Sequence, residues 1–401
     1  MKAAFIADGL RTPIGNFRGS LSGVRCDDLA ALVLKKLVER NPNIPASAID
    51  DVIMGCANQA GEDNRNIARM ALLLAGIPYS VPGETVNRLC ASGMSAVINA
   101  ARGIAAGDGD VFIAAGVENM TRGPWVISKT SQAYGQDAKM YDSSFGWRFI
   151  NPLMHEMYGT DAMGMTAENL AEMYNINRDD QDLFSYRSQM KATAAQSSGR
   201  LAEEIIDVEI PGKKGAVTLF NTDEFIKPTT TTEILGKLKP SFKKDGTVTA
   251  GNASGLNDGA AALFVVSEDA IKKYSITPKA RIVSSAVVGV EPRIMGIGPV
   301  GATLKALAKA GLTLNDINII ELNEAFAAQS LAVTRQLGLA DDDSRVNPNG
   351  GAIAIGHPLG MSGTRIINSA AIELHKQNKR YALATMCIGL GQGYAVVLER
   401  V

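Results

Sequence analysis

Apolar side chains recur along this chain at two alternating spacings. Short apolar runs bounded by turn formers are typical of strands buried in a sheet, and they predict strands at residues 2–7, 48–54, 111–115, 261–267, 318–322, 382–386 and 394–399. Apolar positions three and four residues apart predict helices at 27–40, 67–75, 96–106 and from the end of the 318–322 strand to residue 336. This alternation of strands and helices predicts an α/β fold.

The alternation of strand and helix spacings is interrupted between residues 121 and 247. The segment 121–158 carries both tryptophans without a clean period, and helices are predicted again only at 165–174 and 179–198. An irregular stretch this long usually forms a lid, a binding loop or a subunit contact. We therefore predict an inserted loop domain at 121–247. It interrupts an N-terminal half (1–120, resuming at 248–270) that is followed by a C-terminal half (271–401).

The second half of the chain repeats the first. The hexapeptide Cys90-Ala-Ser-Gly-Met-Ser95 is echoed by His357-Pro-Leu-Gly-Met-Ser362, and each opens an apolar helical stretch. Asp51 precedes Cys90 by 39 residues, and Asn318 precedes His357 by the same interval. Two copies of one strand and helix plan are the simplest account. If the copies pack about a pseudo-twofold axis, Cys90 and His357 lie at equivalent helix starts and both face the join, the interface between the two halves.

The start of a helix changes the chemistry expected of Cys90. A thiol on the first helical turn meets unpaired backbone N–H groups and the positive end of the dipole, and both favour the thiolate. A lone cysteine is more often a packing residue, which is our interpretation of Cys26 and Cys56. The repeat, which puts a histidine at the equivalent position, makes Cys90 a candidate nucleophile and His357 its candidate base.

Two further residues stand at strand ends. Cys387 leads into the glycine-rich turn 389–393, where active residues collect in α/β sheets, although a core cysteine would look the same. That turn runs straight into a strand, which excludes a nucleotide-binding loop. Asn323 either caps the following helix or holds an oxyanion or a water.

Composition narrows the class of protein. The chain has 40 basic and 41 acidic residues, so it lacks the charge that nucleic acid or an anionic membrane would attract. No apolar run approaches the ~18 residues that cross a bilayer, and the N-terminus resembles a strand and not a leader peptide. The four cysteines and three histidines show no metal-ligand or disulfide spacing. We expect a cytoplasmic protein without a metal, nucleic-acid partner or membrane partner.

Five ordered motifs resemble those of the thiolases, and the similarity covers essentially the whole chain. They are Asn87-Arg-Leu-Cys-Ala-Ser-Gly93, Gly251-Asn-Ala-Ser-Gly-Leu-Asn-Asp-Gly-Ala260, Asn323-Glu-Ala-Phe326, Asn347-Pro-Asn-Gly-Gly-Ala-Ile-Ala-Ile-Gly-His-Pro-Leu-Gly-Met-Ser-Gly363 and Cys387-Ile-Gly-Leu-Gly-Gln-Gly393. The resemblance implies two duplicated, layered α/β halves of βαβαβαββ type with an inserted loop domain. It also implies at least a homodimer, with dimer and tetramer both open.

The resemblance further implies a mechanism. Cys90 attacks a 3-ketoacyl-CoA thioester while His357 accepts its proton, and Cys387 protonates the departing acetyl-CoA and later deprotonates free CoA. One oxyanion hole is His357 with a water held by Asn323, and the other is the N–H groups of Cys90 and Gly389. Coenzyme A is a co-substrate, with no bound cofactor implied. Family positions that contact CoA or the acyl group fall on Met163, Phe242, Ala250, Ser254, Met295 and Phe326.

Thiolases differ in acyl-chain preference, and this chain does not resemble all of them equally. Biosynthetic acetoacetyl-CoA thiolases carry a histidine before the Met-Gly pair of a loop-domain helix, whereas Ala162 stands there in this chain. The segments 61–75 and 146–154 are instead similar to β-ketoadipyl-CoA thiolases, which implies cleavage of 3-oxoadipyl-CoA to succinyl-CoA and acetyl-CoA in aromatic-compound catabolism. A cation would then meet the distal carboxylate, and the candidates are Arg65, Arg122, Lys129 and Arg148.

Alternatives to this prediction remain. Each of those four cations could equally be a solvated or subunit-contact residue. A general 3-ketoacyl-CoA or acetoacetyl-CoA thiolase is the alternative enzyme. A non-catalytic acyl-CoA or lipid-binding thiolase-like protein would have lost Cys90, His357 or Cys387, and all three are present.

Overall fold

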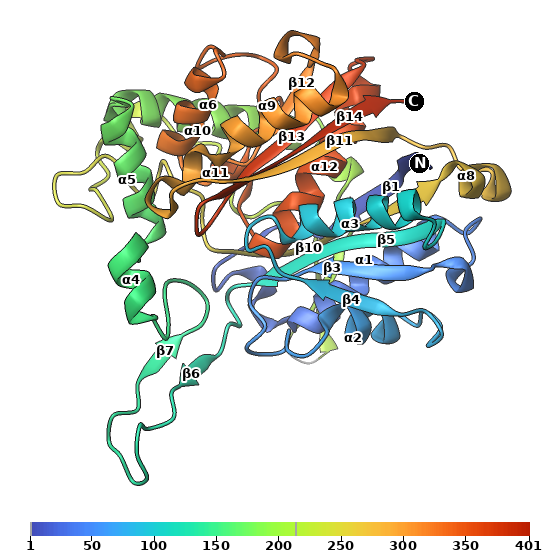
Figure 1. Cartoon of the computed structure of the whole chain (residues 1–401), viewed down its shortest axis with the longest axis horizontal. Coiled ribbons are helices and arrows are strands. Elements are labelled where there is room, and N and C mark those ends of the chain that lie inside the picture. Colours follow the sequence, from blue (N-terminus) through green and yellow to red (C-terminus); the bar gives the residue numbers. More distant parts are fainter. Residues whose placement is uncertain (1, 213–214) are drawn as a thin grey trace.

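Ten strands form the main sheet of the computed structural model, which describes residues 2–212 and 215–401 (Figure 1). The strand order is β12-β13-β14-β11-β1-β10-β5-β3-β4, and β2 (Gly15–Asn16) pairs with β10. The first half supplies β1 (Ala4–Arg11), β3 (Asp51–Gly55), β4 (Gly83–Val86), β5 (Val111–Asn119) and β10 (Asn257–Ser267). The second half supplies β11 (Ala280–Gly289), β12 (Ile319–Leu322), β13 (Tyr381–Ile388) and β14 (Gln392–Arg400). The halves meet where β1 and β11 pair antiparallel, through Phe5 with Arg281 and Ile6 with Ala280.

Both halves follow one order of elements, which confirms the predicted duplicated α/β fold. In the first half α1 (Cys26–Arg40), α2 (Ile67–Leu74) and α3 (Ser92–Ala106) connect the strands. In the second half the equivalent helices are α9 (Gly298–Ala310), α10 (Ala327–Gln336) and α12 (Leu359–Lys376). The counterpart of β4 is reduced to a single parallel bridge between Ile320 and Val346. Helix α8 (Glu268–Tyr274) links the halves.

Helices α3 and α12 pack against each other in the middle of the molecule and contact strands of both halves. A Cβ atom on Gly93 would lie 2.5 Å from Oγ1 of Thr364, and one on Gly363 would lie 2.3 Å from the backbone nitrogen of Met94. Only glycine allows so close a crossing. The crossing brings the starts of the two helices side by side, as the repeat predicted.

The stretch Leu89–Ala106 has the length and the mean hydropathy, 1.2, of a membrane span, although no apolar stretch of that length was expected. It includes α3, most of whose residues are buried between the two half-sheets. This burial is that of a core helix, and exposed residues such as Arg102 occur only in its C-terminal part.

The segment 121–247 contributes none of its described strands to the main sheet. It begins with a two-stranded arm, β6 (Trp125–Ile127) and β7 (Met140–Asp142), that projects from the body in Figure 1. Then follow α4 (Pro152–Tyr158), α5 (Met163–Met173), α6 (Arg178–Ser197), β8 (Val208–Pro211), β9 (Val217–Phe220) and α7 (Thr232–Gly236). The arm and α4 were not predicted.

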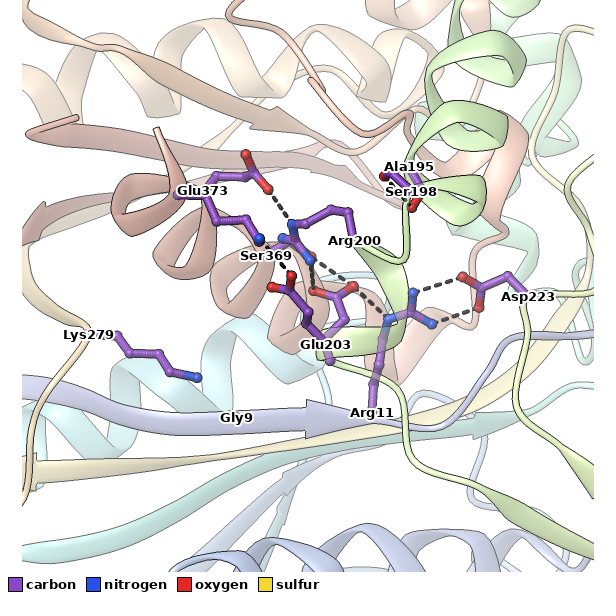
Figure 2. Close-up of polar contacts among 12 residues, drawn as sticks. Gly9, Arg11, Ala195, Ser198, Arg200, Glu203, Asp223, Lys279, Ser369 and Glu373 are labelled. Atoms are coloured by element: carbon purple, nitrogen blue, oxygen red, sulfur yellow. Dashed lines mark hydrogen bonds and ion pairs between the residues drawn. The ribbon is translucent and has the colours of Figure 1, made fainter. Parts of the chain in front are cut away.

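A buried ionic network ties this segment to both halves (Figure 2). Arg11, at the end of β1, donates to Asp223 at 2.7 and 2.8 Å and to Glu204 at 2.8 Å. Arg200 pairs with Glu204 and with Glu373 on α12. Burial disfavours the Glu204 carboxylate, but Arg11 and Arg200 outweigh it and lower its pKa to about 2. Losing one partner of such a pair costs about 3–5 kcal/mol because a buried charge is left unpaired, so this network requires all of its members together.

Candidate active site

Cys90 lies on a tight turn between β4 and α3. Leu89 has a positive φ of 48°, and both N–H and Oγ of Ser92 donate to the Leu89 carbonyl, at 3.0 and 2.7 Å. Helix α3 begins at Ser92 with Ala91 as its N-cap. Cys90 therefore precedes the helix, and the prediction that placed it on the first helical turn was wrong by two residues.

The half-buried Cys90 thiol is not activated in the resting site. Burial raises the pKa of Cys90 to about 11, although the N–H groups of Gly389 and of Cys90 itself act to lower it. The expectation that the helix start favours the thiolate was wrong because desolvation outweighs those N–H groups. A base must therefore remove the proton as the sulfur reacts.

His357 has the same position relative to α12 that Cys90 has relative to α3. Pro358 is the N-cap of α12, and the buried His357 directly precedes it. Nδ1 of His357 lies 2.6 Å from Oγ of Ser362, which lies 2.9 Å from the Pro358 carbonyl oxygen. Because a hydroxyl has one proton and the carbonyl accepts it, Ser362 accepts from Nδ1–H of His357. The lone pair of the imidazole is therefore on Nε2.

The charge state of His357 suits a base. Burial, and after it the positive charge of Arg365, lowers the pKa of His357 to about 3, so the imidazole is neutral at pH 7. Its backbone is held as well, because His357 N–H donates to Oδ1 of Asn257 at 2.9 Å. Gly356, which follows α11 (Ala352–Ile355), has a φ of 110°, and a Cβ there would lie 2.8 Å from Asn257. Glycine at this position lets the chain present His357 in a fixed orientation.

Asn323 follows β12 and is fully buried. Its N–H donates to the Thr385 carbonyl at 3.0 Å, and its Nδ2 lies 3.4 Å from Nε2 of His357. Its Oδ1 has no hydrogen-bond partner among the described residues. Helix α10 has Phe326 as its N-cap without a side-chain cap, so the alternative that Asn323 caps the helix was wrong. The side-chain amide of Asn323 instead faces Nε2 of His357, the nitrogen that carries the free lone pair.

Cys387 is the penultimate residue of β13 and is buried in a cluster that includes Met295, Ala325 and Phe326. Burial, followed by the neighbouring Cys90, raises its pKa well above the ordinary range of a thiol. Strand β14 begins at Gln392, within the glycine-rich turn 389–393, as the exclusion of a nucleotide loop required. The structure thus brings Cys387 beside Cys90, and Asn323 beside His357.

Residues of the loop segment meet this cluster from the side of Phe326. The exposed ring of Phe242 packs edge-to-face on Phe326, with ring centres 6.2 Å apart. Met163, the first residue of α5, places its sulfur 3.8 Å from where a Cβ on Gly389 would stand. These three side chains form an apolar rim near the Cys90 thiol.

The loop that follows residue 247 completes the rim. Ser254 N–H donates to the Ala325 carbonyl at 2.9 Å, and Ala253 pairs with Phe326. Ala250 is exposed on the same loop, whereas Met295 is buried with Cys387. The predicted CoA and acyl positions therefore group around Phe326.

The four cations proposed for a substrate carboxylate differ in their surroundings. Arg122 donates from Nε to Glu62 at 2.8 Å, pairs with it again through Nη2, and donates from Nη1 to the Ser22 carbonyl. Its guanidinium is already engaged within the chain. Arg148 is half-buried with Nη1 3.3 Å from the Ser143 carbonyl, and Arg65 and Lys129 are exposed.

Sequence reasoning missed Ser362 and Asn257, which orient His357. The repeat contains the signal for Ser362, because Ser95 is its equivalent after Cys90. Asn257 lies within the quoted motif 251–260, but nothing in the spacing of that motif connects it to a histidine one hundred residues later.

Comparison with known proteins identifies the family. Residues 4–269 match the family described as "Thiolase, N-terminal domain", and residues 276–400 match "Thiolase, C-terminal domain". The chain is a thiolase. Its similarity to a "Beta-ketoadipyl-CoA thiolase" of Escherichia coli is 60% identity over 100% of both chains, and to one of Pseudomonas putida it is 57% over 100% of both.

Solved structures agree with this assignment. The thiolase superimposes on the Bacillus anthracis acetyl-CoA acetyltransferase with a TM-score of 0.93 at 40% identity, covering 100% of this chain and 99% of that one. It also superimposes on human mitochondrial 3-ketoacyl-CoA thiolase in complex with CoA, with a TM-score of 0.91 at 40% identity, covering 100% and 98%. As an acyltransferase of this family, the protein uses coenzyme A as a substrate.

Proposed function

We propose that this thiolase cleaves 3-oxoadipyl-CoA with CoA to succinyl-CoA and acetyl-CoA, in aromatic-compound catabolism through β-ketoadipate or phenylacetate. One observation carries the proposal: Cys90, His357, Cys387 and Asn323 converge in a chain whose relatives named for β-ketoadipyl-CoA are 54–60% identical over its full length. Thiolytic cleavage has two stages, acylation of the enzyme and transfer of the acyl group to CoA.

Acylation begins when Nε2 of His357 takes the Cys90 proton and the sulfur attacks C3 of the substrate. The expectation that Cys90 attacks the thioester was wrong, because the C2–C3 bond is the one that breaks and the attack must therefore fall on the 3-oxo carbon. The C3 oxygen becomes an oxyanion, and the N–H groups of Cys90 and Gly389, which face the thiol, donate to it. The resting site holds a neutral thiol and a neutral imidazole, so the proton moves as the bond forms.

Cleavage of the adduct restores the C3 carbonyl and leaves the electron pair of the C2–C3 bond on acetyl-CoA as an enolate. The enolate oxygen is stabilised by the protonated Nε2 of His357 and by a water on Asn323, whose Oδ1 meets no partner within residues 2–212 and 215–401. Cys387 then gives its proton to C2. Its raised pKa suits this step, because the thiol keeps its proton until a strong base is beside it. The succinyl group remains as a thioester on Cys90.

Transfer reverses these proton movements. The Cys387 thiolate takes the proton of the CoA thiol, and the CoA sulfur attacks the carbonyl carbon of the succinyl thioester, which was C3 of the substrate. The bond between C3 and the Cys90 sulfur breaks, and Cys90 recovers its proton from His357. The enzyme returns to its starting state, with one C–C bond replaced by one C–S bond.

The distal carboxylate of the substrate requires a positive partner near the acyl end. Arg148 is the favoured candidate of the four, because it is half-buried and its hydrogen bond goes to the Ser143 carbonyl; its charge also acts on the buried Asp63 carboxyl. Arg65 and Lys129 remain candidates, and Arg122 does not, because Glu62 neutralises it.

The decisive experiment compares kcat/KM for 3-oxoadipyl-CoA with that for 3-oxohexanoyl-CoA, which has a methyl group in place of the carboxylate at the same chain length. Acetoacetyl-CoA is the short control. One charge-assisted interaction predicts a preference of about 10–100-fold for 3-oxoadipyl-CoA. Equal values would contradict the proposed substrate but not the thiolase activity. Cleavage that persists in Cys90→Ala would contradict the mechanism.

A general 3-ketoacyl-CoA or acetoacetyl-CoA thiolase is the second proposal. It is supported by an "Acetyl-CoA acetyltransferase" of Syntrophomonas wolfei that is 46% identical over 97% of both chains. Retention of all three reacting residues argues against a non-catalytic, lipid-binding role.

We also propose a cytoplasmic homo-oligomer, at least a dimer. The arm β6–β7 exposes large apolar side chains: Trp125, Ile127, Tyr134 and Met140. Clustered exposed apolar residues are typical of protein contacts, so the arm is the surface that a second copy would cover.

A further inference from the structure

The position that holds Cys387 in the second half has an equivalent in the first. Gly55 and Leu322 correspond through the repeat, and they pair with Gly116 of β5 and Thr385 of β13. Two residues further along each strand stand Glu118 and Cys387. The position near the end of the central strand, which supplies the proposed acid in one half, is therefore a buried carboxylate in the other.

We propose that Glu118 is a positioning residue, which sets the placement of His357 relative to Cys90. This inference rests on the catalytic roles proposed above for those two residues. Glu118 itself is 1% exposed and is a neighbour of both loops of the site without being assigned a step in the reaction.

The first contact of Glu118 is with the His357 loop. Its Oε2 accepts the N–H of Gly360 at 2.8 Å, on the first turn of α12 and three residues after His357. A Cβ on Gly360 would lie 2.3 Å from the Val117 carbonyl, so the helix start is pressed directly onto β5. The carboxylate thus fixes the turn that carries the base.

The second contact is with the segment that supports Cys90. Glu118 accepts the N–H groups of Ala57 at 3.0 Å and of Asn58 at 2.9 Å. The Ala57 carbonyl accepts Nδ2 of Asn87 at 3.0 Å, and Oδ1 of Asn87 accepts the N–H of Leu89 at 2.9 Å. A continuous set of hydrogen bonds therefore runs from Gly360 through Glu118 to the turn that presents the thiol.

This arrangement uses both oxygens of one carboxylate. A glutamine at position 118 would have one acceptor oxygen, and its NH2 group would face a backbone N–H that also donates. Because Oε2 accepts from Gly360 and Ala57 whereas Oε1 accepts from Asn58, the glutamine would lose either the Asn58 N–H or, with its amide reversed, the N–H groups of both Gly360 and Ala57. Because displacing a reacting group by about 1 Å can cost 10²-fold in rate, a small shift would be visible in kcat.

The test compares Glu118→Gln with Glu224→Gln in the full-length protein. Glu224 is a matched control, because its carboxylate accepts the N–H of Asn16 and the hydroxyl of Ser20, both at 2.8 Å, on β2 and the turn after it. We expect Glu118→Gln to lower kcat about 10–100-fold with the KM for CoA changed less than twofold, and Glu224→Gln to keep kcat within twofold. Equal kcat values for the two folded variants would overturn the inference.

Asn87→Ala keeps the inference testable if Glu118→Gln does not fold. It removes the link between Ala57 and Leu89 while leaving Glu118 in place, and kcat is expected to fall about 3–10-fold with an unchanged KM for CoA. An unchanged kcat would overturn the inference. Activity surviving in Cys90→Ala would refute the proposed mechanism on which this inference rests, whereas wild-type kcat in Glu118→Gln with an inactive Cys90→Ala would refute only this role of Glu118.

Discussion

In the first half of this thiolase, the residue that follows β3 is Cys56, and in the second half the equivalent residue after β12 is Asn323. The Cys56 thiol donates to the Asn58 carbonyl at 2.8 Å, whereas Oδ1 of Asn323 has no partner among the described residues. Glu118 and Cys387 differ in the same way, since Glu118 accepts three backbone N–H groups. Equivalent positions thus serve the backbone in one half and face the reacting groups in the other.

The two halves therefore have different roles in the site. Duplication gives two helix starts at one join, which brings a thiol and an imidazole together. Chemistry needs the halves to be unequal, because a polar side chain that is saturated by backbone groups cannot bind substrate. In the second half, the strand-end side chains are not saturated by hydrogen bonds to backbone groups.

The largest expected effect comes from the two residues at the join. Cys90→Ala and His357→Ala should each lower kcat at least about 10⁴-fold, and the double variant should be little worse, because the residues act as one unit. Steady-state cleavage of 3-oxoadipyl-CoA measures the loss. Mass spectrometry of the quenched reaction should find an acyl group on the wild type and none on Cys90→Ala, and an acyl group elsewhere would disprove the assignment.

A smaller loss is expected from Cys387→Ala. Without the acid that protonates C2, kcat should fall about 10²–10⁴-fold. Cys26→Ala is a matched control, because Cys26 is equally buried but lies in the outer core of the first half. That control should lower Tm while keeping kcat within twofold. A Cys387→Ala protein as active as the control would remove Cys387 from the mechanism.

Asn323→Ala and Cys56→Ala test the comparison most directly. Losing the donor of an oxyanion hole should lower kcat about 10²–10³-fold in Asn323→Ala. Cys56→Ala should instead cost about 1–2 kcal/mol of stability with kcat nearly unchanged. Measurements of kcat and of thermal unfolding for both proteins test this prediction. A loss of kcat in Cys56→Ala together with a loss of stability alone in Asn323→Ala would contradict the roles given to the two halves.

The smallest effect is a pH dependence of stability that originates in His357. Its pKa is about 3 in the folded protein and about 6.5 in an unfolded chain, so between these values only the unfolded chain binds the proton. Acidification from pH 7 to 4.5 should therefore destabilise the wild type by about 1–3 kcal/mol more than His357→Gln. Tm measured across this range should fall more steeply for the wild type. Parallel curves would show that the imidazole is not buried in its neutral form.

The strands and helices of the scaffold were predictable because their burial is regular. The predicted strand at 318–322 and helices at 27–40 and 67–75 match β12, α1 and α2 to within a residue at each end. The strand predicted at 2–7 is too short, because β1 continues to Arg11, where the ionic network holds a charged residue at the strand end. The arm β6–β7 has no pattern to detect, because its exposed side chains pack on no core.

The part of the site that lies within the repeat was predictable from the sequence. Equal spacing placed Cys90 and His357 at equivalent helix starts, and the strand ends indicated Cys387 and Asn323. The charge state of Cys90 was predicted wrongly, because a local rule about helix starts does not include the desolvation that two half-sheets impose. Glu118 was missed because two inserted residues hide its equivalence with Cys387 until strand pairing reveals it.

The antiparallel pairing of β1 with β10 has a consequence for synthesis on the ribosome. Strand β1 is among the first segments to emerge, yet β10 at Asn257–Ser267 follows only after most of the chain has been translated. At about 5–20 residues per second, β1 waits on the order of ten seconds or more for its neighbour. His357 emerges later still, so a nascent chain carries the Cys90 thiol without its base and acquires the complete reacting pair only when translation is nearly complete.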